Sequence, residues 1–127
     1  MENAVQERLA DASSEDGRLV AKAVVRAGLA LGLKQAEIAE AIGVSAPQVS
    51  RMKEGVVPVA GKSLELALYL IRVFRSLDAI SGGDTATNRA WMRNRNTDLN
   101  GVPAELVRSA AGLVAVMGYL DAARAPL

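Results

Sequence analysis

The chain has 127 residues, half of them apolar but only 3% aromatic, and it carries 15 basic and 14 acidic side chains. A core built mainly from Ala, Val, Leu and Ile suits closely packed helices, so the composition favours an all-α fold. The chain has no cysteine, which excludes disulfides and thiolate metal sites, and no histidine, which removes the commonest general base. We therefore expect a binding protein without a cofactor rather than an enzyme. No signal peptide and no membrane span is predicted, so we expect a cytoplasmic location.

Charge is distributed unevenly along the chain. Residues 1–16 have one arginine against five acids, a net charge of −4, whereas residues 17–62 have seven basic groups against three acids, a net charge of +4. Residues 63–127 have seven basic groups against six acids, a net charge of +1. A basic segment is typical of a phosphate-binding surface, so the middle third is the part that we expect to meet nucleic acid.

The first predicted element is a short helix over residues 1–12. Nothing in its sequence forces it to dock, so we expect residues 1–16 to form a mobile N-terminal segment. A longer helix is predicted over residues 17–31, because apolar residues recur there at helical spacing and Gly32 follows. Three residues of types that favour a helix N-cap precede this helix, namely Ser13, Ser14 and Asp16.

The next two predicted helices are short and lie on either side of Gly43. One spans residues 35–42, and the other begins at Ser45 and ends before Gly55. A helix-turn-helix needs a small residue where its helices touch, a glycine where the chain reverses, and apolar residues that face the core. Ala39 and Gly43 meet the first two needs, and the apolar set is Ile38, Ile42, Val44, Val49 and Met52. We therefore predict a DNA-binding helix-turn-helix domain over residues 17–62.

The second helix of this motif should present one face to double-stranded DNA. Arg51 is the main candidate for a base contact, because its guanidinium fork matches the two acceptors of guanine in the major groove. Ala46 and Pro47 can meet a thymine methyl group. Gln48 either contacts a base or is used in a capping box with Ser45.

Further contacts are predicted around this face. Ser50 is either a DNA contact or a solvated hydroxyl, and Gln35 can reach a phosphate from the start of the first motif helix. Lys34 and Lys53 either bind phosphates or are exposed lysines without a function. The predicted DNA-binding residues are Lys34, Gln35, Ser45, Ala46, Pro47, Gln48, Ser50, Arg51 and Lys53.

A connector over residues 56–62 separates the motif from a longer helix, which Ser63 is predicted to cap and which ends near Ile80. The apolar residues of this helix form two adjacent stripes, wider than one face of a small domain buries. Either two layers cover them, or part of them forms an oligomer interface. We assign the interface of a homodimer to Leu66, Leu70, Val73 and Leu77.

The remaining sequence predicts a break, a turn and three further helices. The first of these helices begins at Asp84 or Thr85 and carries Trp91. No strand periodicity and no repeat is present. The other boundary signals are the glycines at residues 82–83, a turn over residues 96–101, Pro103 at the start of a helix, and Ser109 before a last helix that ends near Arg124.

The motif resembles the Xre class of helix-turn-helix regulators. Downstream of it, four segments occur in order, namely LIRVFRSLDA at residues 70–79, GGD at residues 82–84, AWM at residues 90–92 and PAEL at residues 103–106. Asn94, Asn96, Leu99 and Gly101 lie between the last two segments. The last helix follows with GL at residues 112–113, YLDA at residues 119–122 and Arg124. This combination resembles the toxin-binding domain of Xre/MbcA/ParS-type antitoxins. The resemblance covers about residues 17–125, and it implies a helical toxin-binding and dimerisation domain over residues 63–127.

The resemblance implies a partner and a site. The partner of a type II pair of this kind is a RES-domain toxin that consumes NAD, and the antitoxin covers its active site and binds the operon's own promoter. The implied toxin-binding residues are Trp91, Arg93, Asn94, Arg95, Asn96, Tyr119, Asp121 and Arg124. From the residues alone, Trp91 can instead be a core residue, the arginines a solvated face, and the last helix pure packing. The competing hypothesis is a stand-alone Xre-type repressor whose residues 63–127 only dimerise.

Overall fold

A computed structural model describes residues 2–125 of the chain, and the side chains of residues 3–5 and 14–125. The described residues form helices and no β-strand, with one isolated bridge between Asn96 and Gly101. The all-α prediction is therefore confirmed. None of the described helices is both long and apolar enough to cross a membrane. The helices are α1 (Glu2–Ala30), α2 (Gln35–Ile42), α3 (Ala46–Lys53), α4 (Gly61–Ser81), α5 (Thr85–Arg93), α6 (Pro103–Leu106) and α7 (Ala110–Arg124).

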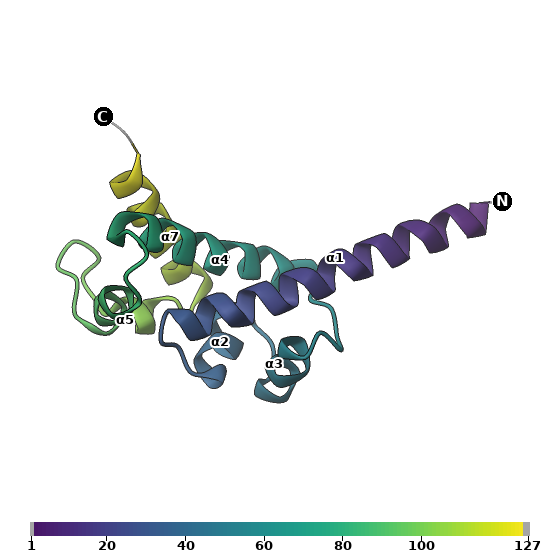
Figure 1. Cartoon of the computed structure of the whole chain (residues 1–127), viewed down its shortest axis with the longest axis horizontal. Helices are drawn as coiled ribbons and strands as arrows, with labels where there is room; N and C mark the ends of the chain where they lie inside the picture. The colour runs from purple at the N-terminus through teal and green to yellow at the C-terminus, as the bar shows by residue number, and fades with distance from the viewer. Residues whose placement is uncertain (1, 126–127) are drawn as a thin grey trace.

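Helix α4 is the centre of the molecule. It packs against α1 on one side and against α7 on the other, while α2 and α3 lie together beneath α1 (Figure 1). One hydrophobic core runs through these contacts, because fully buried residues from all five helices belong to the same cluster. Examples are Val24 of α1, Ile42 of α2, Met52 of α3, Leu70 of α4 and Leu113 of α7.

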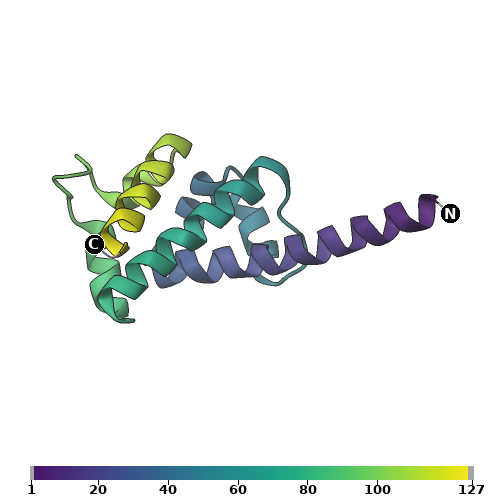
Figure 2. The same ribbon diagram turned by 90° about the horizontal axis from the view of Figure 1, so that it is seen from above.

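Helix α1 differs from the prediction at its start. It is continuous from Glu2, so the N-caps predicted at Ser13, Ser14 and Asp16 are wrong. The physical reason is that no proline interrupts this stretch, and serine and aspartate cost a helix interior only a few tenths of a kcal/mol to about 0.7 kcal/mol each. The first half of α1 projects from the body, as two views at right angles show (Figures 1 and 2). Mobility of residues 1–16 stays a prediction.

Gly17 lies inside α1 and serves a close packing contact. Its carbonyl oxygen accepts a hydrogen bond from the backbone N–H of Val59 at 3.1 Å, which holds the connector against the helix. A Cβ atom at residue 17 would lie 2.7 Å from the Val59 carbonyl oxygen and 2.9 Å from Pro58 Cβ. Glycine is therefore needed here for close approach, and it does not begin a helix as the sequence suggested.

Helix α4 corrects two predictions. It begins at Gly61 with Ala60 as N-cap, so Ser63 lies in its first turn and is not the cap. In one of the two apolar stripes, Leu70, Val73 and Leu77 are at most 3% exposed beneath α1 and α7, whereas Leu68 in the other stripe is 49% exposed. Those three residues belong to the core of the single chain, and their assignment to a dimer interface is wrong. The fourth, Leu66, is half-buried.

Most other predicted boundaries are confirmed. Gly43 ends α2 in the left-handed conformation, with φ of 75°. The Ser45, Asp84 and Ser109 side chains each accept a hydrogen bond from the backbone N–H three residues on, at 3.2, 3.0 and 3.1 Å. Pro103 is the first residue of α6.

Candidate functional site

Helices α2 and α3 cross as the predicted helix-turn-helix requires. Ala39 is 4% exposed, and Val44 N–H donates to its carbonyl oxygen at 3.0 Å just after the chain reverses at Gly43. Ile38 and Met52 are fully buried, so both helices turn their apolar residues into the shared core. The outer face of α3 is left for a partner.

That outer face carries the predicted base contacts. Pro47, Ser50, Arg51 and Lys53 are exposed together with Ala46, while Val49 on the opposite side of the helix is fully buried. Within the described part of the chain, Arg51 takes part in no hydrogen bond or ion pair between side chains. Its guanidinium is therefore available to a ligand.

Two serine side chains, Ser45 and Ser50, make hydrogen bonds within the motif. Ser50 Oγ donates to Gln35 Oε1 at 3.0 Å, which joins the outer side of α3 to the start of α2. The hydroxyl of Ser50 is thus used within the motif. The Gln48 backbone N–H donates to Ser45, but the described contacts do not include a hydrogen bond from its side chain back to Ser45, so the capping box is only half formed.

Lys34 is the N-cap of α2, and its own side chain is exposed. Because a lysine side chain cannot accept a hydrogen bond, the cap comes from Glu37, whose Oε1 accepts from the Lys34 backbone N–H at 2.8 Å. The Glu37 carboxylate also offsets the unfavourable position of the Lys34 cation at the positive end of the helix dipole.

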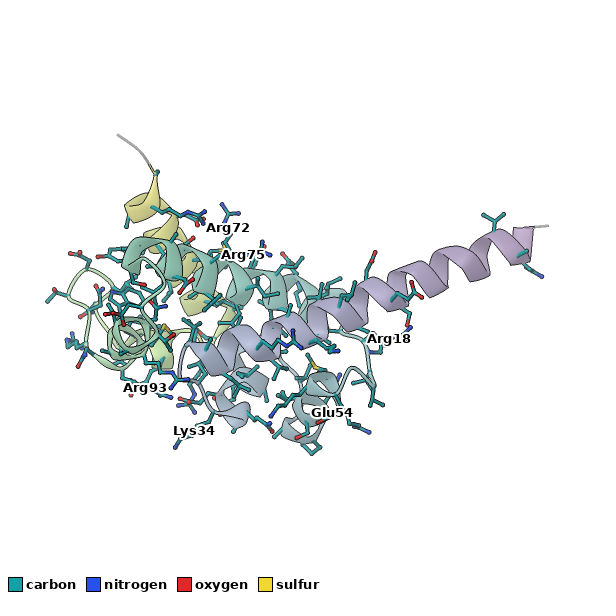
Figure 3. The ribbon with its side chains drawn as sticks, viewed as in Figure 1. Arg18, Lys34, Glu54, Arg72, Arg75 and Arg93 are labelled. Carbon is teal, nitrogen blue, oxygen red and sulfur yellow. The ribbon has the colours of Figure 1, made fainter. Side chains whose placement is uncertain are left out.

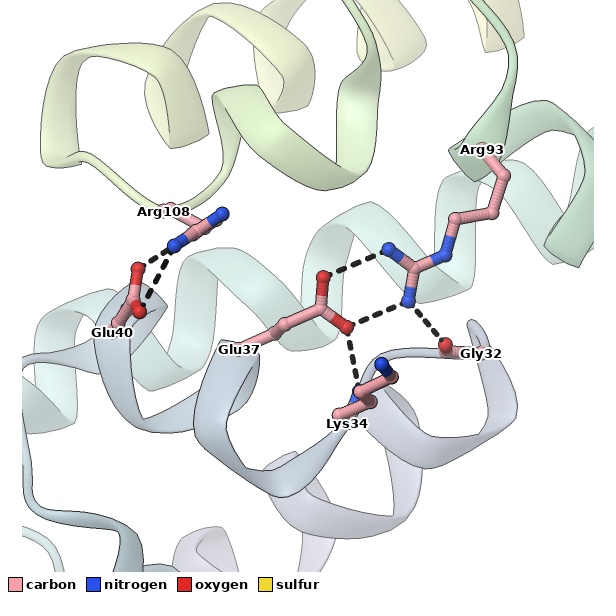
Figure 4. A network of polar contacts seen from close by, with 6 residues as sticks. All are labelled: Gly32, Lys34, Glu37, Glu40, Arg93 and Arg108. Carbon is pink, nitrogen blue, oxygen red and sulfur yellow. Dashed lines mark hydrogen bonds and ion pairs between the residues drawn. The ribbon is translucent and has the colours of Figure 1, made fainter.

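Glu37 also binds Arg93, from the other half of the chain (Figure 4). Arg93 Nη1 and Nη2 donate to the two carboxylate oxygens at 2.8 and 2.6 Å, and Nη2 also donates to the Gly32 carbonyl oxygen at 2.7 Å. These hydrogen bonds from Arg93, with the N–H of Lys34 as a further donor, lower the pKa of Glu37 to about 2 despite its partial burial. Arg93 is therefore engaged within the chain, and its contact with a toxin stays a prediction.

Two further arginines tie the C-terminal half to α1 and α2. Arg108 binds the Glu40 carboxylate through Nε and Nη2, the latter at 3.0 Å (Figure 4), and its guanidinium lowers the pKa of Glu40. Arg89 donates from Nε and Nη2 to the carbonyl oxygens of Ala30 and Leu29, at 3.3 Å each, and so caps the C-terminus of α1. Arg89 and Arg93 thus both contact the C-terminal end of α1 and the turn after it.

An aromatic pair marks the surface formed by α5 and α7. The rings of Trp91 and Tyr119 are stacked, with centroids 6.3 Å apart and planes inclined by 17°. Both residues are half-buried, so Trp91 is neither a full core residue nor a free contact. The Tyr119 hydroxyl donates to Asp98 Oδ2 at 3.0 Å and connects α7 to the loop after α5.

The loop over residues 94–102 is built by its own polar side chains. Asn94 Nδ2 donates to the Ala90 carbonyl oxygen at 2.7 Å, and Asn96 Oδ1 accepts from Leu99 N–H at 3.0 Å. Arg95 Nη2 donates to Asn100 Oδ1 at 2.6 Å, at the turn where Asn100 has φ of 55°. The two asparagines at residues 94 and 96 therefore shape the loop, and Arg95 extends from it with an exposed side chain.

The last two implied toxin contacts face α4. Asp121 accepts from Ser76 Oγ at 3.1 Å and pairs with Arg72 at 3.0 Å, so it is held by α4. Arg124 Nη1 donates to Ser76 Oγ at 3.5 Å. These contacts join α7 to α4.

Two family models match the chain. Residues 12–72 match the antitoxin Xre-like helix-turn-helix domain, and residues 76–125 match the antitoxin Xre/MbcA/ParS C-terminal toxin-binding domain. The chain belongs to the Xre/MbcA/ParS-type antitoxins. No curated protein matches it in sequence. The boundary between the two matches falls inside α4, so in this antitoxin both domains share one helix.

Sequence reasoning missed the polar contacts between the two domains of the antitoxin. Glu37 stands 56 residues from Arg93, and Glu40 stands 68 residues from Arg108. The sequence contained one usable signal. Glu37 lies three residues after Lys34, the spacing at which a glutamate side chain accepts a hydrogen bond from the backbone N–H of the N-cap residue. A part-buried contact was also missed: Asn88 is 1% exposed, and its Nδ2 donates to Oδ1 of the half-buried Asp78 at 2.9 Å.

Proposed function

We propose that this antitoxin neutralises a RES-domain toxin that consumes NAD, and that it represses its own operon by binding promoter DNA as a homodimer. The observation that carries the proposal is the presence of two separate partner surfaces on one folded chain. One is the exposed face of α3, and the other is the stacked pair of Trp91 and Tyr119 with its adjoining loop.

The DNA part of the proposal rests on α3. Its exposed face carries Arg51 and Lys53 on the last turn, and Lys34 stands exposed at the start of α2. In Figure 3, Lys34 and Glu54, which follows α3, lie on the same side of the molecule. An arginine reads guanine from such a helix, while lysines beside it bind phosphates.

The toxin part rests on the surface of α5 and α7. Half-buried aromatic residues with a polar rim are typical of the energetic centre of a protein interface. Here Trp91 and Tyr119 supply the aromatic centre, and the hydrogen bond from Tyr119 to Asp98 joins it to the polar loop that carries the exposed Arg95. We propose that this surface covers the toxin's active site, with RES chemistry expected from the family resemblance.

The test uses two variants, each of which should lose one of the two proposed activities and keep the other. Arg51→Ala should weaken binding to the operon's promoter by about 1–3 kcal/mol and relax discrimination at one base pair. Trp91→Ala should lose the toxin in a pull-down with the product of the neighbouring gene, and cells that co-express the two should lose NAD. Lys62→Ala, a change at an exposed side chain outside the Trp91–Tyr119 pair, is the control for the pull-down.

The outcomes separate the proposal from its alternative. If the neighbouring product does not bind and NAD does not change in any variant, the stand-alone repressor remains and the toxin part is wrong. If Arg51→Ala loses the same affinity on matched and mutated operators, Arg51 contacts a phosphate and not a base. Circular dichroism of Trp91→Ala shows whether its loss of binding reflects a loss of fold.

A further inference from the structure

A groove runs along the outer side of α1 and α4. Two adjoining hollows of about 630 and 380 Å³ share Ala23, Ile71 and Arg75, and so they form one continuous depression. We call it the α1–α4 groove. Its apolar floor includes two of the most exposed large apolar side chains in the described part of the chain, Leu19 at 67% and Leu68 at 49%. Contiguous apolar surface of this kind marks an interaction site.

Arginines form the rim of this groove. Arg72 and Arg124 are held by Asp121 and Ser76, whereas Arg26 and Arg75 take part in no hydrogen bond or ion pair among the described residues. In Figure 3, Arg72 and Arg75 lie on the side of the molecule away from Lys34 and Glu54. A ligand that covers the apolar floor must also offer carboxylates to the rim, because an unpaired charge is costly to bury.

The N-terminal half of α1 has the complementary character. Residues 2–16 carry five acids against one arginine, and they project from the body without packing against another helix (Figures 1 and 2). Val5 in this segment is 54% exposed. A projecting helix with excess negative charge and an exposed apolar side chain is a ligand for an apolar groove rimmed by arginines.

We propose that residues 2–16 of a second copy dock into the α1–α4 groove, and that each copy in turn receives the same segment from its partner. The proposal rests on the homodimer proposed above and identifies its interface. It replaces the interface expected at Leu70, Val73 and Leu77, which the core of the single chain uses.

The lengths agree with this arrangement. At 1.5 Å per residue, residues 2–16 form about 22 Å of helix, and the α1 side of the groove, residues 19–30, is about 18 Å long. If the two α1 helices run antiparallel and cross near residue 16, Val5 of one copy lies beside Ala27 of the other. Both grooves are then filled by one symmetric contact, as a two-fold dimer requires.

The test is charge reversal and rescue, measured by sedimentation equilibrium of the full chain. The wild type should be a dimer that weakens as salt increases, because the contact is partly electrostatic. Arg75→Glu should weaken self-association about tenfold or more, which corresponds to about 1.4 kcal/mol. Adding Glu7→Arg and Asp11→Arg to Arg75→Glu should restore the dimer, and Lys62→Glu should leave it unchanged.

Several outcomes would overturn the proposal. One is a wild type that stays monomeric at every concentration; another is a dimer that Arg75→Glu leaves intact, or that the added reversals fail to restore. Since the assay contains neither toxin nor DNA, its failure leaves the toxin and DNA parts of the proposed function untouched.

Discussion

Glu37 is the residue at which the DNA-binding and toxin-binding domains meet. Its carboxylate caps α2 through the Lys34 backbone N–H and binds both Nη atoms of Arg93. The side chain of Glu37 is 15% exposed and that of Arg93 is 42% exposed, so the pair is shielded from water on one side only. Both sets of hydrogen bonds favour the charged carboxylate, and for this reason its pKa is lowered to about 2.

The lowered pKa of Glu37 leads to a prediction for acid stability. A carboxyl group whose pKa falls from 4.5 to about 2 on folding stabilises the protein above pH 4.5, and this contribution is lost as the pH falls toward 2. Glu37→Gln should therefore reduce the free energy of unfolding at neutral pH by about 1–3 kcal/mol. It should also flatten the fall in stability between pH 4.5 and 2.

Urea unfolding at a series of pH values measures both effects. Glu54→Gln is the matched control, because Glu54 is exposed at the end of α3 and forms no ion pair among the described residues. A Glu37→Gln variant with the wild-type pH profile would mean that the ion pair with Arg93 does not contribute to folding in solution.

At the scale of the helices, local signals determined how well each boundary could be predicted. Ser45, Asp84 and Ser109 cap their own helices through contacts three residues away, so the sequence was sufficient there. The start of α4 was predicted wrongly, because Ala60 has no side chain that can cap a helix, whereas Ser63 has one. Leu70 is buried by α1 and α7, and these tertiary contacts cannot be predicted from the periodicity of α4 alone.

In the candidate site, too, features set by local sequence could be predicted and features set by distant contacts could not. The exposed face of α3 followed from the 3.6-residue period, since Val49 and Met52 fix which side faces the core. The role of Arg93 did not, because its partner Glu37 is distant in sequence and close only after the two domains pack. The stacking of Trp91 on Tyr119 also depends on how α7 crosses α5, which no local pattern encodes.

The two glycines of α7 give a prediction at the scale of this helix. A Cβ atom at Gly112 would overlap the carbonyl oxygen of Leu106, so the turn between α6 and α7 closes only around glycine. Gly118 lies six residues further along the same helix, and a Cβ there would meet no atom within 4 Å. Gly112→Ala should destabilise the antitoxin by about 1–3 kcal/mol through overpacking. Gly118→Ala should stabilise it by about 0.5–1 kcal/mol.

Thermal unfolding of both variants is the measurement, and each serves as the other's control because the chemical change is the same. If both raise the melting temperature, helix propensity determines the effect, and the turn at Leu106 tolerates a side chain.

At the scale of the whole molecule, the two domains share one hydrophobic core. The connector over residues 56–62 appears in the sequence as a domain boundary, yet α4 beyond it packs on α1 before it. Ala67, Leu70 and Val73 are fully buried in the core that both domains share. The pairs of Glu37 with Arg93 and Glu40 with Arg108 add polar contacts across the same boundary.

We therefore predict that a fragment of residues 57–127 does not fold by itself. Removal of α1, α2 and α3 would expose the face of α4 that holds Ala67 and Leu70, and it would leave Arg93 and Arg108 without their partners. A fragment of about 70 residues buries too little surface to offset these losses. Its circular dichroism should show weak helicity, and its urea unfolding should lack a cooperative transition, while the full chain shows both.

Whether this fragment folds also determines how toxin binding and DNA binding are linked in cells. If it fails to fold, a toxin-binding surface exists only on chains whose helix-turn-helix is also folded, so every antitoxin able to bind the toxin is also able to bind DNA. Cells that express the fragment with the toxin should then show no rescue and little accumulated fragment, since unfolded chains are degraded. A fragment that unfolds cooperatively and rescues growth would show instead that α4 and α7 form a sufficient core, and that the contacts with α1 only join two independent domains.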